Sequence, residues 1–154
     1  MKDETMNDEY WMNKALQLAR RAEQAGEVPV GAVLVKDNEL IAEGWNQPVS
    51  SSDATSHAEI MAMREAGKKL DNYRLIDTVM YVTLEPCSMC VGAMIHARVS
   101  KVVYGACEPR TGALGGAFNL LEANAHNHTF DIESGVLEDE SRAMLQAFFK
   151  ARRK

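Results

Sequence analysis

The sequence has few cysteines and no long apolar run. Only Cys87, Cys90 and Cys107 occur among 154 residues. Such an odd, sparse set argues against a disulfide framework and favours metal-binding or catalytic thiols. The longest apolar stretch, residues 28–35, is far shorter than the roughly 18–20 residues of a membrane span, and the first ten residues lack a signal-peptide pattern. We therefore expect a cytoplasmic protein with no membrane segment.

Acidic residues are missing from the C-terminal end. All 22 of them precede Ser141, although the net charge of the whole chain is −5. An acidic protein is an unusual partner for nucleic acid, because Lys and Arg make most phosphate contacts. The last residues nevertheless form a basic, aromatic segment that suits phosphate contact and base stacking, with a solvated helix tail as the alternative. The residues expected to contact nucleic acid here are Phe149, Arg152 and Arg153.

Strand-like and helix-like segments alternate along the chain, whose length fits one domain spanning residues 1–154. The periodicity and the turn residues predict helices at 7–25, 56–69, 87–97 and about 138–154. They predict strands at 30–35, 40–45, 78–84, 101–106 and 130–136. Because parallel neighbours need a crossover, this order indicates an α/β fold with helices on both faces of a sheet.

One imidazole and two thiols occur at spacings typical of a zinc site. Cys87 and Cys90 are three residues apart at the start of a predicted helix and face the same side, and His57 starts another helix. Both helix N-termini would favour thiolate over thiol. Three protein donors leave the fourth tetrahedral position to water, which is the arrangement of a catalytic zinc site. We therefore expect one zinc ion held by His57, Cys87 and Cys90.

Glu59 lies two residues after His57, beside the expected metal without binding it. A carboxylate there can take the proton of an activated water molecule, so Glu59 is the candidate general base. The alternative is structural. Ser56 and Glu59 match the capping box S-x-x-E, which only fixes the start of a helix.

The combination H-x-E followed by P-C-x-x-C is the signature of zinc-dependent nucleobase deaminases. More of the chain, from about Tyr10 to Phe149, resembles the bacterial tRNA adenosine deaminases of the cytidine/deoxycytidylate deaminase superfamily. The segments that carry the resemblance are EVPVGAVLV (27–35), GWN (44–46), HAEIMA (57–62), NYRLID (72–77), YVTLEPC (81–87), GAMIHAR (92–98), TGA (111–113) and NH (127–128).

The resemblance implies a three-layer α/β/α fold with a central five-stranded mixed sheet, as in cytidine deaminases. It implies a homodimer with one zinc ion per subunit and a tRNA anticodon stem-loop as substrate. It also implies that the enzyme is a hydrolase that converts the wobble adenosine to inosine, with Glu59 as proton shuttle. By the same resemblance Asn46 binds the flipped base, Val28 and Pro29 line its pocket, and Asn127 and His128 contact neighbouring nucleotides.

Two segments depart from the family pattern. Residues 53–56 read Asp-Ala-Thr-Ser where members usually have Asp-Pro-Thr-Ala, and Glu108 stands where an aspartate usually approaches a substrate ribose. Because a 2′-OH contact helps to distinguish RNA from DNA, the choice of nucleotide stays open at this point. Two alternatives also stay open: a deaminase of a free base or nucleoside of the cytosine, guanine or cytidine type, and a non-catalytic zinc-stabilised RNA-binding protein.

Overall fold

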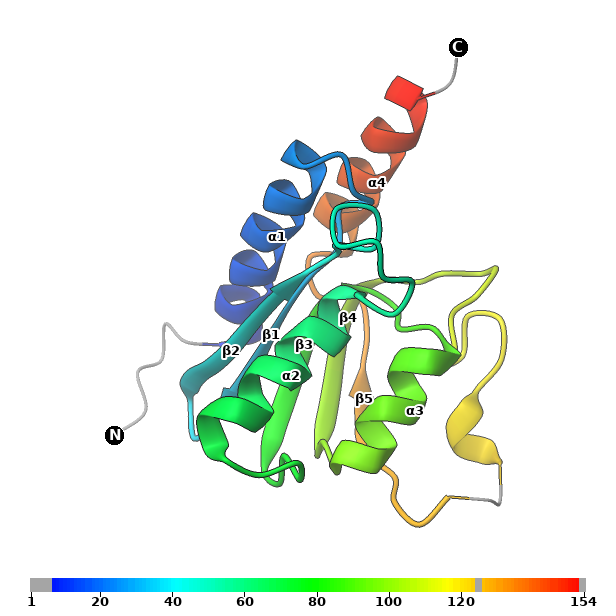
Figure 1. Cartoon of the computed structure of the whole chain (residues 1–154). Coiled ribbons are helices and arrows are strands. Elements are labelled where there is room, and N and C mark those ends of the chain that lie inside the picture. Colours follow the sequence, from blue (N-terminus) through cyan, green and yellow to red (C-terminus); the bar gives the residue numbers. More distant parts are fainter. Residues whose placement is uncertain (1–6, 124–125, 153–154) are drawn as a thin grey trace.

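The computed structural model describes residues 7–123 and 126–152, which form a sheet between two layers of helices (Figure 1). The helices are α1 (Asp8–Gln24), α2 (Ala58–Leu70), α3 (Ser88–Ala97) and α4 (Glu138–Arg152), with a short 3-10 helix η1 (Leu120–Glu122). The strands are β1 (Gly31–Lys36), β2 (Glu39–Trp45), β3 (Thr78–Leu84), β4 (Lys101–Ala106) and β5 (Asp131–Glu133). The expected α/β class and the five-stranded sheet are confirmed.

Local signals in the sequence position the first elements. The side chain of Asn7 accepts a hydrogen bond from the backbone N–H of Tyr10 and caps α1, and Gly26 follows the helix with a φ of +81°. Asp37 and Asn38 both have positive φ in the two-residue turn between β1 and β2. Asn and Asp tolerate that conformation, and a turn with two positive φ values suits the twist of a hairpin.

The sheet has the order β2-β1-β3-β4-β5. β1 pairs antiparallel with both β2 and β3, whereas β4 pairs parallel with β3 and β5. The mixed sheet follows from the connections: a tight turn joins β1 to β2, and α3 is the crossover between the parallel strands β3 and β4. β5 is shorter than the expected strand at 130–136, since the described residues that pair with β4 are Asp131, Ile132 and Glu133.

Two hydrophobic cores fill the space on the two faces of the sheet. On one face α2 and α3 pack on alternate residues of the central strands, such as Leu34, Val82 and Val102. On the other face α1 packs on the intervening residues, such as Val33 and Val103, and α4 lies beside α1 (Figure 1). Because the central strands are covered on both faces, their apolar residues need not alternate with polar ones.

Within the described part of the chain, no helix has the length and apolar character that a bilayer crossing requires.

Candidate active site

Three donor atoms from two helix starts converge beside the sheet. The Nδ1 atom of His57 lies 3.6 Å from the sulfur of Cys87 and 3.6 Å from the sulfur of Cys90, and the two sulfurs are 3.9 Å apart. Tetrahedral zinc with usual bond lengths would place two sulfurs about 3.8 Å apart and a sulfur and a nitrogen about 3.6 Å apart. The donor set therefore fits a zinc ion without rearrangement, and the expected ligands are brought together.

The two helices present these donors at their N-terminal ends. His57 is the N-cap residue directly before α2 and Cys87 the N-cap residue directly before α3, and both have extended backbone angles. Neither side chain caps its own helix, so each is available for a metal. The unpaired N–H groups and the partial positive charge of a helix N-terminus stabilise thiolate at this position. Pro86 directly precedes the N-cap residue Cys87 and so lies outside α3.

Hydrogen bonding among the donors shifts their pKa values in opposite directions. The two thiols share one proton, so the bond to Cys90 lowers the pKa of Cys87 to about 3 and the bond to Cys87 raises the pKa of Cys90. The hydrogen bond to Cys87 also raises the pKa of His57. Of these shifts, that of Cys87 favours the metal-binding thiolate, and a bound cation would have to displace the protons that the shifts of Cys90 and His57 favour.

Glu59 lies in the first turn of α2 and is only 4% exposed. Burial raises the pKa of Glu59 to about 7, and its charged neighbours are His57 and Cys87. A carboxyl group with such a pKa gains and loses a proton readily near neutral pH. The capping-box alternative is not realised, because the hydroxyl of Ser56 bonds instead to the hydroxyl of Ser51 at 2.9 Å.

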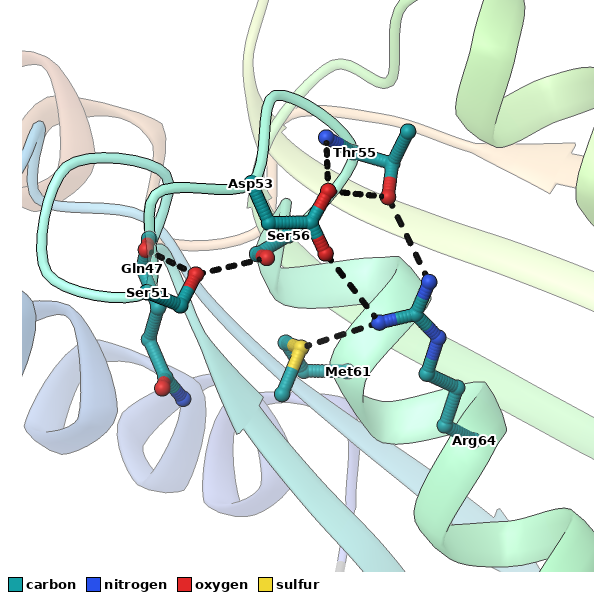
Figure 2. Close-up of polar contacts among 7 residues, drawn as sticks. All are labelled: Gln47, Ser51, Asp53, Thr55, Ser56, Met61 and Arg64. Atoms are coloured by element: carbon teal, nitrogen blue, oxygen red, sulfur yellow. Dashed lines mark hydrogen bonds and ion pairs between the residues drawn. The ribbon is translucent and has the colours of Figure 1, made fainter.

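The loop between β2 and α2 is held in place by polar contacts with α2 (Figure 2). The Arg64 guanidinium lies 3.5 Å from the Asp53 carboxylate and donates a hydrogen bond to the Thr55 hydroxyl at 3.3 Å. Asp53 in turn accepts hydrogen bonds from the N–H and hydroxyl of Thr55, and these bonds lower the pKa of Asp53. These contacts thus fix the conformation of the loop directly before His57.

Asn46 stands at the start of this loop and faces the same cavity as the metal donors. Its side-chain oxygen accepts a hydrogen bond from the backbone N–H of Ala58 at 2.9 Å, so that Asn46 satisfies the first turn of α2. The amide nitrogen of Asn46 is thereby left as the group that can donate to a bound molecule.

The cavity next to the three donors has a volume of about 260 Å³. Its lining includes the expected residues Val28 and Asn46, whereas Pro29 is buried and does not line it. The complete lining is Val28, Val30, Asn46, Pro48, His57, Glu59, Leu84, Glu85, Cys87 and Thr111.

A groove of about 570 Å³ adjoins the cavity, and the two share Val28 and Leu84. Glu108 and Phe149 line this groove, and both also line a further hollow that includes Arg110 and Arg152. Cationic side chains of α4, Arg142 and Lys150, lie along the first groove. Arg142 is ion-paired with Glu138 and Asp139, so among the described residues that line the first groove Lys150 is the cation left to meet a polyanion.

Arg152 has a structural role that the sequence did not predict. Its guanidinium donates a hydrogen bond to the carbonyl of Gly26 at 2.8 Å and lies 4.3 Å from the centre of the Phe148 ring. The bond to Gly26 fixes the end of α4 to the segment that leads into Val28. Arg153, the other expected arginine, lies outside the described residues.

Asn127 and His128 are not in the cavity of their own chain. The side chain of Asn127 is exposed, and the Nε2 atom of His128 lies 2.8 Å from the carbonyl oxygen of Val99. Val99 follows the C-terminal end of α3, whereas the metal donors lie at the N-terminal end of that helix. Within one chain these two residues are therefore at the opposite end of α3 from Cys87.

Two buried carboxylates near the cavity were missed by sequence reasoning. Glu27 and Glu85 are 2% and 3% exposed; Glu27 precedes Val28, which lines the cavity, and Glu85 lines it directly. Glu27 accepts hydrogen bonds from the N–H groups of Val49 and Ser50 at 3.2 and 2.6 Å. The only signal in the sequence is a charged residue inside an otherwise apolar segment, because the partners are backbone groups of distant loops.

The fold and the three donors beside a buried carboxyl define a zinc-dependent hydrolytic deaminase domain. Comparison with known proteins agrees. The family model described as the cytidine and deoxycytidylate deaminase zinc-binding region matches residues 5–106. The chain belongs to this deaminase family.

Individual relatives and solved structures refine the comparison. The chain is 49% identical to a tRNA-specific adenosine deaminase of Haemophilus influenzae, over 95% of this chain and 85% of that protein. A solved structure from a study of A-to-I editing by tRNA:A34 deaminases at the wobble position superposes with a TM-score of 0.86 and 40% identity. It covers 88% of this chain and 99% of that one. A guanine deaminase structure from Nitrosomonas europaea gives a TM-score of 0.74 at 26% identity, over 91% and 83% of the two chains.

Proposed function

We propose that this chain hydrolyses adenosine at the wobble position of a tRNA anticodon to inosine and ammonia. The observation that supports this most directly is the buried carboxyl of Glu59 beside three donors that fit a zinc ion, next to a cavity that adjoins a groove lined by Phe149 and Lys150. The similarity to proteins named tRNA-specific adenosine deaminases supports the substrate.

The residues that line the cavity have separate roles in the proposed reaction. A zinc ion held by the three donors supplies Lewis-acid activation of water. Asn46 donates a hydrogen bond from its side-chain N–H₂ group to an acceptor on the base, and Val28 and Leu84 offer apolar contact. Glu59 takes a proton from the attacking water, passes it to a ring nitrogen and then assists the departure of ammonia. Because Glu59 is buried, this proton stays within the site.

The rest of the anticodon stem-loop would follow the groove along α4. A free base needs only the cavity of about 260 Å³, whereas in the adjoining groove Lys150 suits a phosphate and Phe149 suits stacking of a neighbouring base. Glu108 lies in this groove, where its carboxylate also accepts a hydrogen bond from the N–H of Arg110 at 2.9 Å. We place the nucleotides that flank the target adenosine beside Glu108 and Phe149. We expect the reaction to take place in the cytoplasm, where tRNA is found.

We further propose that the whole chain, residues 1–154, acts as one domain of a homodimer. A groove of about 700 Å³ runs between α2 and α3 and is lined by apolar side chains such as Ile60, Met63 and Ala93. Tyr73, at the rim of this groove, is 72% exposed. A second copy seated on this surface would remove apolar area from water and bring its α3 close to the first site. Asn127 and His128 would then contact RNA bound across the two subunits.

The test is a substrate panel with the zinc-loaded protein. We expect inosine from an anticodon stem-loop with adenosine at the wobble position, and no product from free adenosine, cytidine or guanine. Single-stranded DNA of the same sequence measures discrimination of the ribose. Turnover of free guanine or adenosine as fast as of the stem-loop would instead favour a free-base deaminase, and zinc binding with no product from any substrate would favour the non-catalytic alternative.

A further inference from the structure

The segment that follows β4 closes around one side chain. From Cys107 to Phe118 the described chain forms turns and isolated bridges rather than a paired strand or a helix. Three of its backbone N–H groups donate to the carboxylate of Glu85: those of Glu108 at 2.9 Å, Leu114 at 2.9 Å and Gly116 at 2.8 Å. Glu85 is 3% exposed, so these contacts are largely screened from water.

Two glycines let the segment approach this carboxylate closely. A Cβ atom added at Gly112 or at Gly116 would overlap the Glu85 carboxylate and the carbonyl oxygen of Glu108. Only a residue without a side chain fits at either position. The segment is therefore shaped around Glu85 rather than laid loosely over it.

Glu85 also joins this segment to the metal-binding turn. It stands two residues before Cys87, and the carbonyl of Pro86 accepts the N–H of Ala113 at 2.9 Å. Glu85 and Thr111 both line the cavity, and Glu108 lines the adjoining groove. The position of Thr111 and Glu108 relative to the metal donors thus depends on the Glu85 carboxylate.

We infer that Glu85 is a positioning residue: it holds the segment 107–116 as one wall of the substrate site and thereby sets the affinity for RNA rather than the rate of the chemical step. The claim that Glu85 sets the affinity for RNA rests on the proposed function, whereas the claim that it holds the segment does not. A carboxylate offers two acceptor oxygens, but a glutamine amide offers one oxygen and turns an N–H₂ group toward N–H donors. Glu85→Gln keeps the size of the side chain and breaks this pattern.

The test compares Glu85→Gln with the wild-type enzyme well below the unfolding temperature of both. We expect unchanged zinc content and kcat, with KM for the stem-loop raised about tenfold or more, since uniform binding is lost. Without substrate, hydrogen exchange at the amides of Leu114 and Gly116 should accelerate about tenfold or more. Unchanged KM and unchanged exchange would overturn the inference.

Two further variants separate positioning from general destabilisation. Met12→Ala removes a fully buried side chain of α1 on the other face of the sheet and lowers stability without touching the segment. If Met12→Ala raised KM as much as Glu85→Gln, the role of Glu85 would be merely structural. Gly116→Ala keeps the carboxylate but displaces the segment, so it should raise KM in the same way; an unchanged KM would contradict the inference even if Glu85→Gln failed to fold.

The failure of the proposed function would look different. In that case the wild-type enzyme itself would give no inosine from the stem-loop, while accelerated exchange at Leu114 and Gly116 in Glu85→Gln would still support the placement of the segment. Exchange that stays at the wild-type rate would reject the placement whatever the substrate proves to be.

Discussion

The side-chain oxygen of Asn46 accepts the backbone N–H of Ala58 at 2.9 Å and so caps α2 from outside the helix. His57, which occupies the position that normally provides a cap, uses its side chain for the metal site instead. One residue thus completes the helix that presents the metal donor and turns its amide nitrogen toward the cavity. The helix start and the proposed recognition of the base are therefore coupled through a single side chain.

Asn46→Asp separates the two roles. The carboxylate can still accept the N–H of Ala58, but it cannot donate to a base. We expect near wild-type stability and a fall in kcat/KM of about a hundredfold for the stem-loop, in line with the large penalty for an unpaired buried polar contact.

Asn46→Ala is the matched variant. It should lower kcat/KM for the stem-loop and also the free energy of unfolding, the latter by about 1 kcal/mol because the cap of α2 is lost. Denaturant unfolding and steady-state kinetics measure the two effects. Full activity of Asn46→Asp would show that the amide nitrogen does not touch the base.

Glu59→Gln should abolish inosine formation while the site remains assembled. A glutamine has the same shape but cannot exchange the proton, so kcat should fall by about a thousandfold or more. Zinc content, measured by elemental analysis, and stem-loop affinity should stay close to wild type. Glu65→Gln, the same change on the exposed side of α2, should have no effect. Persistent turnover by Glu59→Gln would remove Glu59 from the mechanism.

Much of this architecture could be predicted because the signals are local. Asn7 and Gly26 mark the ends of α1, and the spacing of Cys87 and Cys90 indicates a shared metal from sequence alone. The contacts that hold the loops could not be predicted. Glu27 and Glu85 bond to backbone N–H groups more than 20 residues away, and a backbone donor leaves no mark on residue type.

The end of the chain illustrates the same limit. Its basic composition predicts a cationic surface, and Phe149 lines the groove that adjoins the cavity. Composition cannot show that Arg152 is bound to the carbonyl of Gly26, because that contact joins residues 126 positions apart. A count of positive charges therefore overstates how many of them are free for phosphate.

Glu27→Gln should reduce the loss in free energy of unfolding that the protein shows as the pH falls. Burial alone would raise the pKa of Glu27, but hydrogen bonds from Ser50 and Val49 lower it below its usual value. A carboxylate with a lowered folded-state pKa adds stability above its unfolded pKa, near 4.5, and this stability is lost as the pH falls through the folded value.

The measurement for Glu27 is the free energy of unfolding as a function of pH from neutrality down to about 3. The wild-type protein should lose more stability over this range than Glu27→Gln. Glu43→Gln, on an exposed position of β2, should follow the wild-type curve. Parallel curves for wild type and Glu27→Gln would show that the contacts of Glu27 with the 49–50 segment do not depend on its charge.

Ala93→Arg tests the proposed subunit surface. Ala93 lines the apolar groove between α2 and α3, where an arginine would bring a charge into a desolvated contact. We expect a monomer by light scattering where the wild type is a dimer, and loss of stem-loop deamination if RNA crosses both subunits. His96→Arg, on an exposed position of the same helix, should remain dimeric. A dimer of unchanged affinity in Ala93→Arg would place the subunit contact elsewhere.

Lys150→Ala tests whether the groove along α4 carries RNA. Lys150 lines this groove, and no contact of the kind that binds Arg152 to Gly26 is found for it among the described residues. Each phosphate contact to a single strand contributes about 0.7 to the slope of log K against log salt, so the slope should fall by about that amount. Lys36→Ala, at the far end of β1, should leave the slope unchanged. Because Arg152 anchors α4, Arg152→Ala should lower stability as well as affinity, whereas Lys150→Ala should lower affinity alone. An unchanged slope in Lys150→Ala would mean that the phosphates follow another path from the cavity.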